Sequence, residues 1–197
     1  MHRWIFLTLI ALSAVFDLHA QGQAAQAKPA VDINQLAINW VDQLNGLSNW
    51  YLTMDGKEDG VADAVDRMMN LLAPDVIAQV PPNDEEQIGP VRLVGKDHVR
   101  KWVEKIAKTQ VQIKYKIQRQ TEADADGELM VHSKPLPWGG VSVAFQVLGA
   151  YTSRETRIKY LELGAVFLQY GEDGKIHRIR LLLSEKAEVL DSPDGEI

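Results

Sequence analysis

The chain has 197 residues, of which 46% are hydrophobic, which is enough for one well-buried domain and short for two. Its formal net charge is -6, and no stretch of the sequence concentrates Lys and Arg, so the usual electrostatic footprint of a nucleic-acid-binding protein is excluded. With no cysteine, the sequence also excludes disulfides, thiol catalysis and a lipidated cysteine anchor.

The first twenty residues differ in character from everything that follows. They combine a positive start, an apolar run over residues 4–16 and a small residue at Ala20, a pattern that predicts a secretory signal peptide over residues 1–20. Signal peptides are cleaved after small residues, so we expect cleavage after Ala20 or as late as Ala27. The run is shorter than the roughly 20 apolar residues of a spanning helix, which disfavours a permanent membrane anchor. We therefore expect a periplasmic or secreted protein without stable membrane insertion.

The remainder divides into three parts by composition. Residues 21–31 read as an alanine-rich polar linker, residues 32–184 as a single domain, and the acidic residues 185–197 as a flexible tail.

Three amphipathic helices are predicted from apolar residues at three- and four-residue steps. The first follows a possible N-cap at Asp32 and covers residues 36–52, the second covers residues 61–72 before Pro74, and the third covers residues 96–108.

The apolar period changes to two in the strands. Strands are predicted over residues 75–80, 110–118, 128–134, 141–151, 158–170 and 175–183, and the last two are joined by a glycine-bearing turn. Helices segregated from most of the strands predict an α+β fold in which a curved antiparallel sheet wraps around the helices.

Four short phrases stand at the junctions of these elements: Asn49-Trp50-Tyr51, Leu71-Leu72-Ala73-Pro74-Asp75-Val76, Val94-Gly95-Lys96-Asp97 and Asp173-Gly174-Lys175-Ile176. These phrases and the order of the elements resemble the nuclear transport factor 2 superfamily, which includes ketosteroid isomerases and SnoaL-like polyketide cyclases. The resemblance spans about Asp32 to Ser184. It implies a cone-shaped α+β domain, a homodimer formed through the open sheet face, and an apolar pocket between helices and sheet that takes a small apolar ligand.

The resemblance also orients the last two strands. It directs Tyr160, Glu162, Gly164, Val166 and Leu168 of the penultimate strand inward, and His177, Ile179, Leu181 and Leu183 of the final strand. The ligand pocket is accordingly expected to include Trp50, Tyr51, Met54, Val80, Tyr160, Val166, Ile179 and Leu183.

Ketosteroid isomerase chemistry does not carry over to this sequence. The positions that the family uses for its carboxylate base and its protonated acid correspond to Val80 and Val166, and a valine can neither remove nor share a proton.

Glu162 is the candidate catalytic residue that remains. A carboxylate on an apolar strand face can act as a general acid or base. The alternative is a solvated strand end, or a salt bridge with Arg157, Lys159 or Arg178.

The histidines offer weaker candidates. His98, His132 and His177 are each interpreted as exposed, or at a dimer interface for His132, and none is spaced to share a metal ion with another. No metal and no cofactor are expected.

Arg178 and Arg180 alternate with the inward residues and are expected to point outward, in company with Lys114, Lys116 and Gln146. Such a face is either a dimer surface or ordinary solvated sheet.

Three functions follow in order of preference. The first is an exported small-molecule-binding domain with an apolar pocket and unknown ligand. The second is a SnoaL-like lyase, isomerase or hydrolase that acts on an apolar cyclic compound. The third is a protein-interaction module that uses the sheet face. An open pocket with a buried carboxylate would favour the enzyme, an open apolar pocket the binding domain, and a packed interior the interaction module.

Overall fold

The computed structural model describes residues 32–48, 59–81, 90–120, 128–183 and 187–189. The chain divides into a unit over Met1–Asp32 and a second unit over Ile33–Ile197, and the fold below is that of the second unit.

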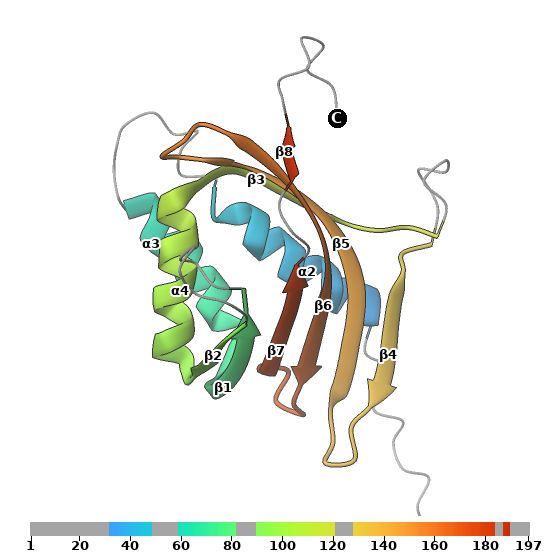
Figure 1. The fold of residues 1–197 in the computed structure, drawn as a ribbon. Coiled ribbons are helices and arrows are strands. Elements are labelled where there is room, and N and C mark those ends of the chain that lie inside the picture. Colours follow the sequence, from blue (N-terminus) through green and yellow to red (C-terminus); the bar gives the residue numbers. More distant parts are fainter. Residues whose placement is uncertain (1–31, 49–58, 82–89, 121–127, 184–186, 190–197) are drawn as a thin grey trace, which may run out of the picture. The chain divides into compact units, whose positions relative to one another are not determined.

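Three helices form part of this unit (Figure 1): α2 (Ile33–Gly46), α3 (Asp59–Asn70) and α4 (Lys96–Thr109). Each buries one stripe of its surface. In α2, Ala37, Trp40 and Val41 are buried at the three- and four-residue spacing of one helix face. Gly95 precedes α4 with a φ of 86°, a left-handed conformation that glycine adopts without strain, and its N–H donates to the carbonyl of Val76.

The strands belong to one eight-stranded sheet, with the order β2-β1-β7-β6-β5-β3, in which β4 also pairs with β5 and β8 with β6. Their bounds are β1 (Leu72–Val80), β2 (Val91–Val94), β3 (Gln110–Ile117), β4 (Val131–Pro135), β5 (Val141–Ser153), β6 (Lys159–Tyr170), β7 (Ile176–Leu183) and β8 (Ala187–Val189).

The sheet is mixed, whereas the sequence predicted an antiparallel one. β1 runs parallel to β7, and every other named pairing is antiparallel. Between β1 and β7 the chain passes through β2, α4 and strands β3 to β6, and β7 then joins β1 at the edge opposite β2. The α+β fold class and the wrapping of a curved sheet around helices are confirmed.

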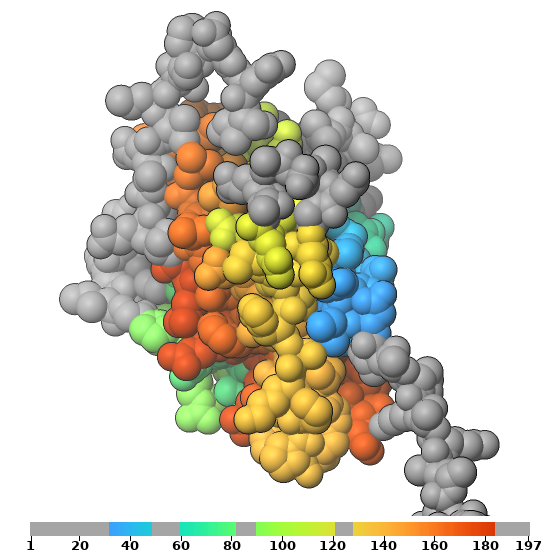
Figure 2. All heavy atoms as spheres, turned by 90° about the vertical axis from the view of Figure 1, so that its right-hand side faces the viewer, coloured from blue at the N-terminus to red at the C-terminus, as the bar shows by residue number. Residues whose placement is uncertain are grey.

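α2 lies against one face of the sheet, and strands β7, β6 and β5 cross in front of it in Figure 1. In Figure 2, which turns toward the edge of the sheet, β4 and β5 (yellow) lie beside α2 (blue). Hydrogen bonds fix both ends of the helix. The Tyr170 hydroxyl of β6 donates to the carbonyl of Leu36 at 3.1 Å, and the side chain of Asn45 bonds to the backbone of Tyr115 in β3.

Element boundaries differ from the predictions at four places. The helix predicted to run to residue 52 ends at Gly46, and residues 47 and 48 form a turn. Pro74 lies inside β1, where its missing N–H is tolerated. β2 was missed because four residues, Val91–Val94, show no clear alternation. β8 pairs with β6 within the segment predicted to be a flexible tail.

Candidate functional site

The interior face of β6 carries a buried carboxylate. Along this strand the even-numbered residues face the helices, and Glu162, Val166 and Leu168 are only 4%, 2% and 0% exposed. The inward orientation predicted for these residues is confirmed by this alternation. The interpretation of Glu162 as a solvated strand end is wrong, because its neighbours on the same face are core residues.

A glycine brings a tyrosine of β3 into contact with Glu162. Gly149 of β5 pairs with Tyr115 on one side and Glu162 on the other, so the three residues form one row across three strands. A Cβ on residue 149 would lie 2.7 Å from Cζ of Tyr115 and closer still to two other ring carbons. The absence of a side chain therefore lets the Tyr115 ring cross β5, and its hydroxyl donates to Oε2 of Glu162 at 2.7 Å.

Asn45, near the end of α2, holds the backbone of Tyr115 in place. The backbone N–H of Tyr115 donates to Oδ1 of Asn45 at 2.6 Å, and Nδ2 of Asn45 donates to the carbonyl of Tyr115 at 3.0 Å. One side-chain amide thus satisfies both backbone groups of Tyr115, as a neighbouring strand would. A bulge lies just before this contact in β3. Gln112 has a φ of 54°, and the register with β5 shifts between Val111 and Lys114.

Two further tyrosines complete what we call the carboxylate–tyrosine cluster: Tyr115, Tyr151, Tyr160 and Glu162. Tyr151 and Tyr160 are cross-strand partners whose ring centroids lie 5.4 Å apart at 31°. Burial raises the pKa of the Tyr115 and Tyr151 phenols above the ordinary value of 10.0, and the negative charge and hydrogen bonding of Glu162 raise it further. Both phenols therefore stay protonated at neutral pH, and the Tyr115 phenol donates to the carboxylate.

The other residues predicted for the pocket lie in three places. Val80, Val166 and Ile179 are 1%, 2% and 3% exposed and belong to the continuous apolar core, whereas Tyr160 packs against it half-buried. Leu183 is half-buried and lies over Gly164, where an added Cβ would be 2.5 Å from its Cδ2. Trp50, Tyr51 and Met54 lie outside the described residues.

Sequence reasoning missed one interior polar group. Trp40 of α2 is 2% exposed, and among the residues that the structure describes its indole N–H has no acceptor. An unsatisfied buried donor costs about 1–3 kcal/mol, so a bound acceptor at this position would recover that free energy. The signal in the sequence was only a tryptophan within an apolar helical stripe, which is typical of any core.

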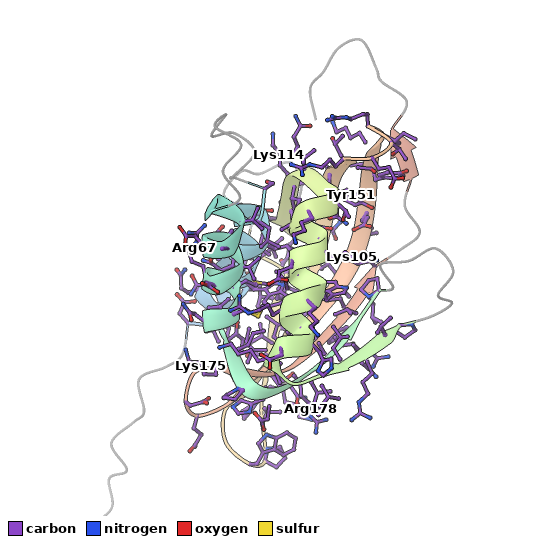
Figure 3. The ribbon with its side chains drawn as sticks, turned by 90° about the vertical axis from the view of Figure 1, so that its left-hand side faces the viewer. Arg67, Lys105, Lys114, Tyr151, Lys175 and Arg178 are labelled. Carbon is purple, nitrogen blue, oxygen red and sulfur yellow. The ribbon has the colours of Figure 1, made fainter. Side chains whose placement is uncertain are left out.

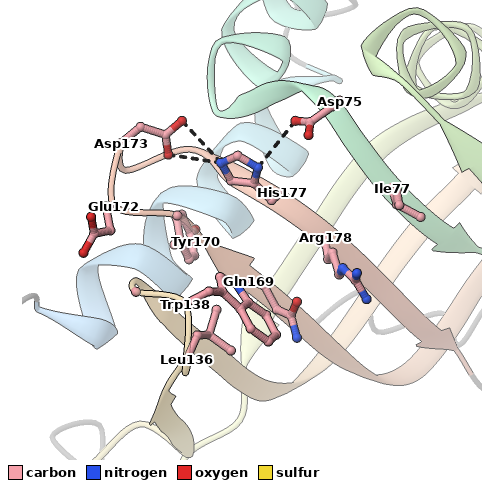
Figure 4. A pocket seen from close by; sticks show the side chains of 12 residues that line it. Asp75, Ile77, Leu136, Trp138, Gln169, Tyr170, Glu172, Asp173, His177 and Arg178 are labelled. Carbon is pink, nitrogen blue, oxygen red and sulfur yellow. Dashed lines mark hydrogen bonds and ion pairs between the residues drawn. The ribbon is translucent and has the colours of Figure 1, made fainter.

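A second set of polar groups surrounds a hollow of about 480 Å³ at the turn between β6 and β7 (Figure 4). Here Nδ1 of His177 lies 3.4 Å from Asp75, and Nε2 lies 3.2 Å from Asp173. The backbone N–H of Lys175 holds the pKa of Asp173 below its usual value, and His177 lowers it further. Because both ring nitrogens already face carboxylates, this histidine has no free nitrogen to act as a base on a substrate.

The predicted inward orientation of His177 is wrong. Gln169 pairs with Arg178 and Tyr170 pairs with Ile176, so a bulge leaves His177 as the extra residue between them. Its side chain is 40% exposed. The accompanying prediction that it is open to solvent near the turn is confirmed, as is the exposure of His98 and His132.

The hollow and the carboxylate–tyrosine cluster lie toward opposite ends of the sheet. Tyr160 and Gln169 are nine residues apart on β6, which corresponds to about 30 Å of strand. Figure 3 shows Tyr151, from the cluster, and Arg178, from the hollow, at the two ends of the same sheet. Among the described residues, no group of three or more His, Asp or Glu is arranged to hold a metal ion.

We compared the chain with known proteins by sequence and by structure. No protein-family model matches the chain, and no curated protein matches it by sequence. Among solved structures, it is similar to a proposed aromatic ring hydroxylase from Novosphingobium aromaticivorans (TM-score 0.54, 12% identity, 80% of this chain and 90% of that one). It is also similar to a proposed scytalone dehydratase from the same species (TM-score 0.51, 15% identity, 84% and 98%). The epoxide hydrolase/cyclase-like enzyme SalBIII of salinomycin pyran ring formation matches with a TM-score of 0.50, 11% identity, and coverage of 77% and 90%.

The chain has the nuclear transport factor 2-like fold. At these identities the agreement establishes the fold and not the activity, since nuclear transport factor 2-like domains support several unrelated functions. In this nuclear transport factor 2-like domain, no described helix has the length and apolar character to cross a bilayer.

Proposed function

We propose that the domain binds a small, mostly apolar organic molecule in its interior, with Glu162 as the polar anchor. The observation that carries the proposal is a carboxylate only 4% exposed, on the interior face of the sheet, with the Tyr115 hydroxyl at 2.7 Å. A hydroxyl or amine of a ligand would add a donor to those that this carboxylate already has. Val166 and Leu168 of the same face belong to the apolar core, and the body of such a molecule would pack against them.

Native mass spectrometry tests this proposal on the untagged protein purified from its host. Glu162→Gln keeps the shape of the side chain and removes its charge, and Glu172→Gln is the matched control, because that carboxylate is exposed beside the distant hollow. We expect a copurifying molecule in the wild type and in E172Q, and a reduced amount in E162Q. Equal occupancy of all three proteins would contradict the role of Glu162.

Calorimetric titration with phenol, benzylamine and toluene gives a second measurement that needs no natural ligand. The two probes with a donor are expected to bind the wild type about tenfold more tightly than toluene, a preference that one hydrogen bond to a charged group supplies. E162Q should lose this preference. If no probe binds and nothing copurifies, the interior is a packed core and the binding function is refuted.

A second candidate function is acid–base catalysis on an apolar cyclic compound, as a lyase, isomerase or hydrolase. It is favoured by the phenol of Tyr115 and the carboxylate of Glu162 standing at hydrogen-bond distance, with the phenol kept protonated by its raised pKa. Mass spectrometry of the copurified molecule incubated with wild type in deuterated water tests it. Deuterium incorporated at carbon by the wild type and not by E162Q supports a lyase or isomerase, and conversion to a product of hydrolysis by the wild type alone supports a hydrolase. If neither change is seen, binding alone remains.

We also infer that the domain is exported, and the support is the signal-peptide pattern of residues 1–20, which lie outside the described residues. Intact-mass measurement of the protein from its host tests this. A mature chain that begins at Gln21 or Lys28 supports export, and a chain that retains the first twenty residues contradicts it. The homodimer implied by the family resemblance stays a prediction, and sedimentation analysis tests it.

A further inference from the structure

The sheet face turned away from α2 collects basic side chains that are dispersed in the sequence. Gln79 of β1 pairs with Arg92 on one side and with Arg180 on the other, and Arg180 pairs with Phe167 of β6. One row across four strands is therefore arginine, glutamine, arginine and phenylalanine. The next row includes Arg178, and further cations on the same face come from β3 and β4. We call Arg92, Lys114, Lys116, His132, Lys134, Arg178 and Arg180, all exposed, together with the exposed Leu163, Phe167 and Leu182, the basic sheet face.

These cations are not neutralised locally. Within the part of the chain that the structure describes, no ion pair involves an arginine or lysine of the basic sheet face. The adjoining carboxylates, Asp75 of β1 and Asp173 at the β6–β7 turn, already contact His177. A protein with a formal net charge of -6 thus presents one face of the opposite sign.

The arginines surround a groove of about 410 Å³ that Phe167 also lines. Arg178 and Arg180 are two residues apart on β7, a spacing of about 7 Å. Arg92 lies two strands away from Arg180, at about 10 Å. Carboxylates on alternate residues of an extended peptide repeat at the same spacing of about 7 Å, so this arrangement is complementary to them.

We propose that the basic sheet face docks an acidic polypeptide segment in extended conformation, with its carboxylates on the arginines and an apolar side chain against Phe167. Arginine suits this role because its planar guanidinium binds carboxylates through two parallel hydrogen bonds. This surface is distinct from the interior site proposed above, and neither proposal depends on the other.

Composition favours a polypeptide over a membrane or a nucleic acid. Exposed Phe167, Leu163 and Leu182 lie among the cations, and aromatic residues with arginine are enriched where proteins meet. The homodimer that the family resemblance implies would use this same face, so it competes with a peptide. A second copy in face-to-face register would place cations against cations, which opposes that pairing.

Fluorescence anisotropy tests the proposal on the full chain with a labelled peptide in which serine separates alternate positions that hold glutamate and one phenylalanine, so that these side chains lie on one face of the extended peptide. Its counterpart, with glutamine in place of glutamate, is the control probe. The test variant is Arg178→Gln with Arg180→Gln, and the control variant is Arg67→Gln, which changes an exposed arginine on α3, away from the sheet (Figure 3). Circular dichroism checks that each variant keeps its fold, as expected for exposed side chains.

We expect the glutamate peptide to bind at least tenfold more tightly than the glutamine peptide, and the double variant to lose this advantage while R67Q retains it. Binding should weaken as salt rises. Equal binding of both peptides, or an unchanged double variant, overturns the proposal. So does binding of phosphatidylserine vesicles without binding of the peptide, which would assign the face to lipid. A dimer that R178Q/R180Q dissociates would assign it to a second copy and likewise overturn the proposal.

Discussion

Replacing Gly149 with alanine tests the geometry that places Tyr115 on Glu162. The added Cβ would occupy the position of the tyrosine ring, with 2.7 Å to Cζ and less to two other carbons, so the ring has to move. Overpacking of this kind costs about 1–3 kcal/mol. A displaced ring also loses its hydrogen bond to a charged acceptor, which is worth about 1.5–3 kcal/mol.

One effect opposes these costs. Alanine restricts the unfolded chain more than glycine, which stabilises the folded state by about 0.5–1 kcal/mol. The net expectation is a free energy of unfolding lower by about 2–5 kcal/mol, measured by urea denaturation monitored by circular dichroism. Gly46→Ala is the matched control, because nothing lies within 4 Å of a Cβ at that helical position and the same substitution should be neutral or stabilising.

A double-mutant cycle separates the two costs. Tyr115→Phe removes the hydroxyl and keeps the ring, so it should destabilise the wild type by about 1.5–3 kcal/mol and the G149A background by much less. If G149A and G46A unfold at the same urea concentration, the ring does not cross β5 and the described contact is refuted. Full additivity of Y115F and G149A would show that the hydrogen bond survives the substitution, which also contradicts the reasoning.

Two further predictions follow from the same region. Asn45→Ala should lower the free energy of unfolding by about 1–3 kcal/mol, because two backbone groups of Tyr115 lose their partner. Asn39→Ala, on the exposed side of the same helix, should change it little. Equal effects of the two variants in urea denaturation would show that Asn45 does not hold Tyr115 in place. At alkaline pH, Tyr115, Tyr151 and Tyr170 have a pKa raised above 10.0, so their phenols bind protons more strongly in the folded state and stability falls as pH rises above that value. Near-ultraviolet titration should show that only part of the five tyrosines ionises before the protein unfolds, and reversible ionisation of all five in the folded state near pH 10 would contradict this.

The strand alternation was the part of the structure most accessible from sequence. Period-two patterns located β5, β6 and β7 to within about two residues and set Glu162 on the same face as Val166 and Leu168. This succeeded because one face of these strands is buried and the other is solvated, so register and face are strongly specified.

The pairing of Glu162 with Tyr115 could not be predicted, because it depends on the register between β3 and β6, whose contacting residues are 47 positions apart. A glycine inside a strand was the available signal, since it marks close approach of another group. His177 was misplaced by a single bulge. Sequence reasoning placed Arg178, Arg180, Lys114 and Lys116 together on the outward face. It missed Arg92 there because strand β2 was not predicted.

The parallel pairing of β1 with β7 has a consequence for how the domain folds. Ile77 and Arg178 are partners about 100 residues apart, so β1 gains this neighbour only after nearly the whole domain has been synthesised. Contacts of such long sequence separation close large loops and slow folding. Until β7 arrives, β1 is paired only with β2 and its other edge is open, and such edges recruit other chains. The nascent chain is therefore most prone to aggregation during the interval between the synthesis of β1 and that of β7.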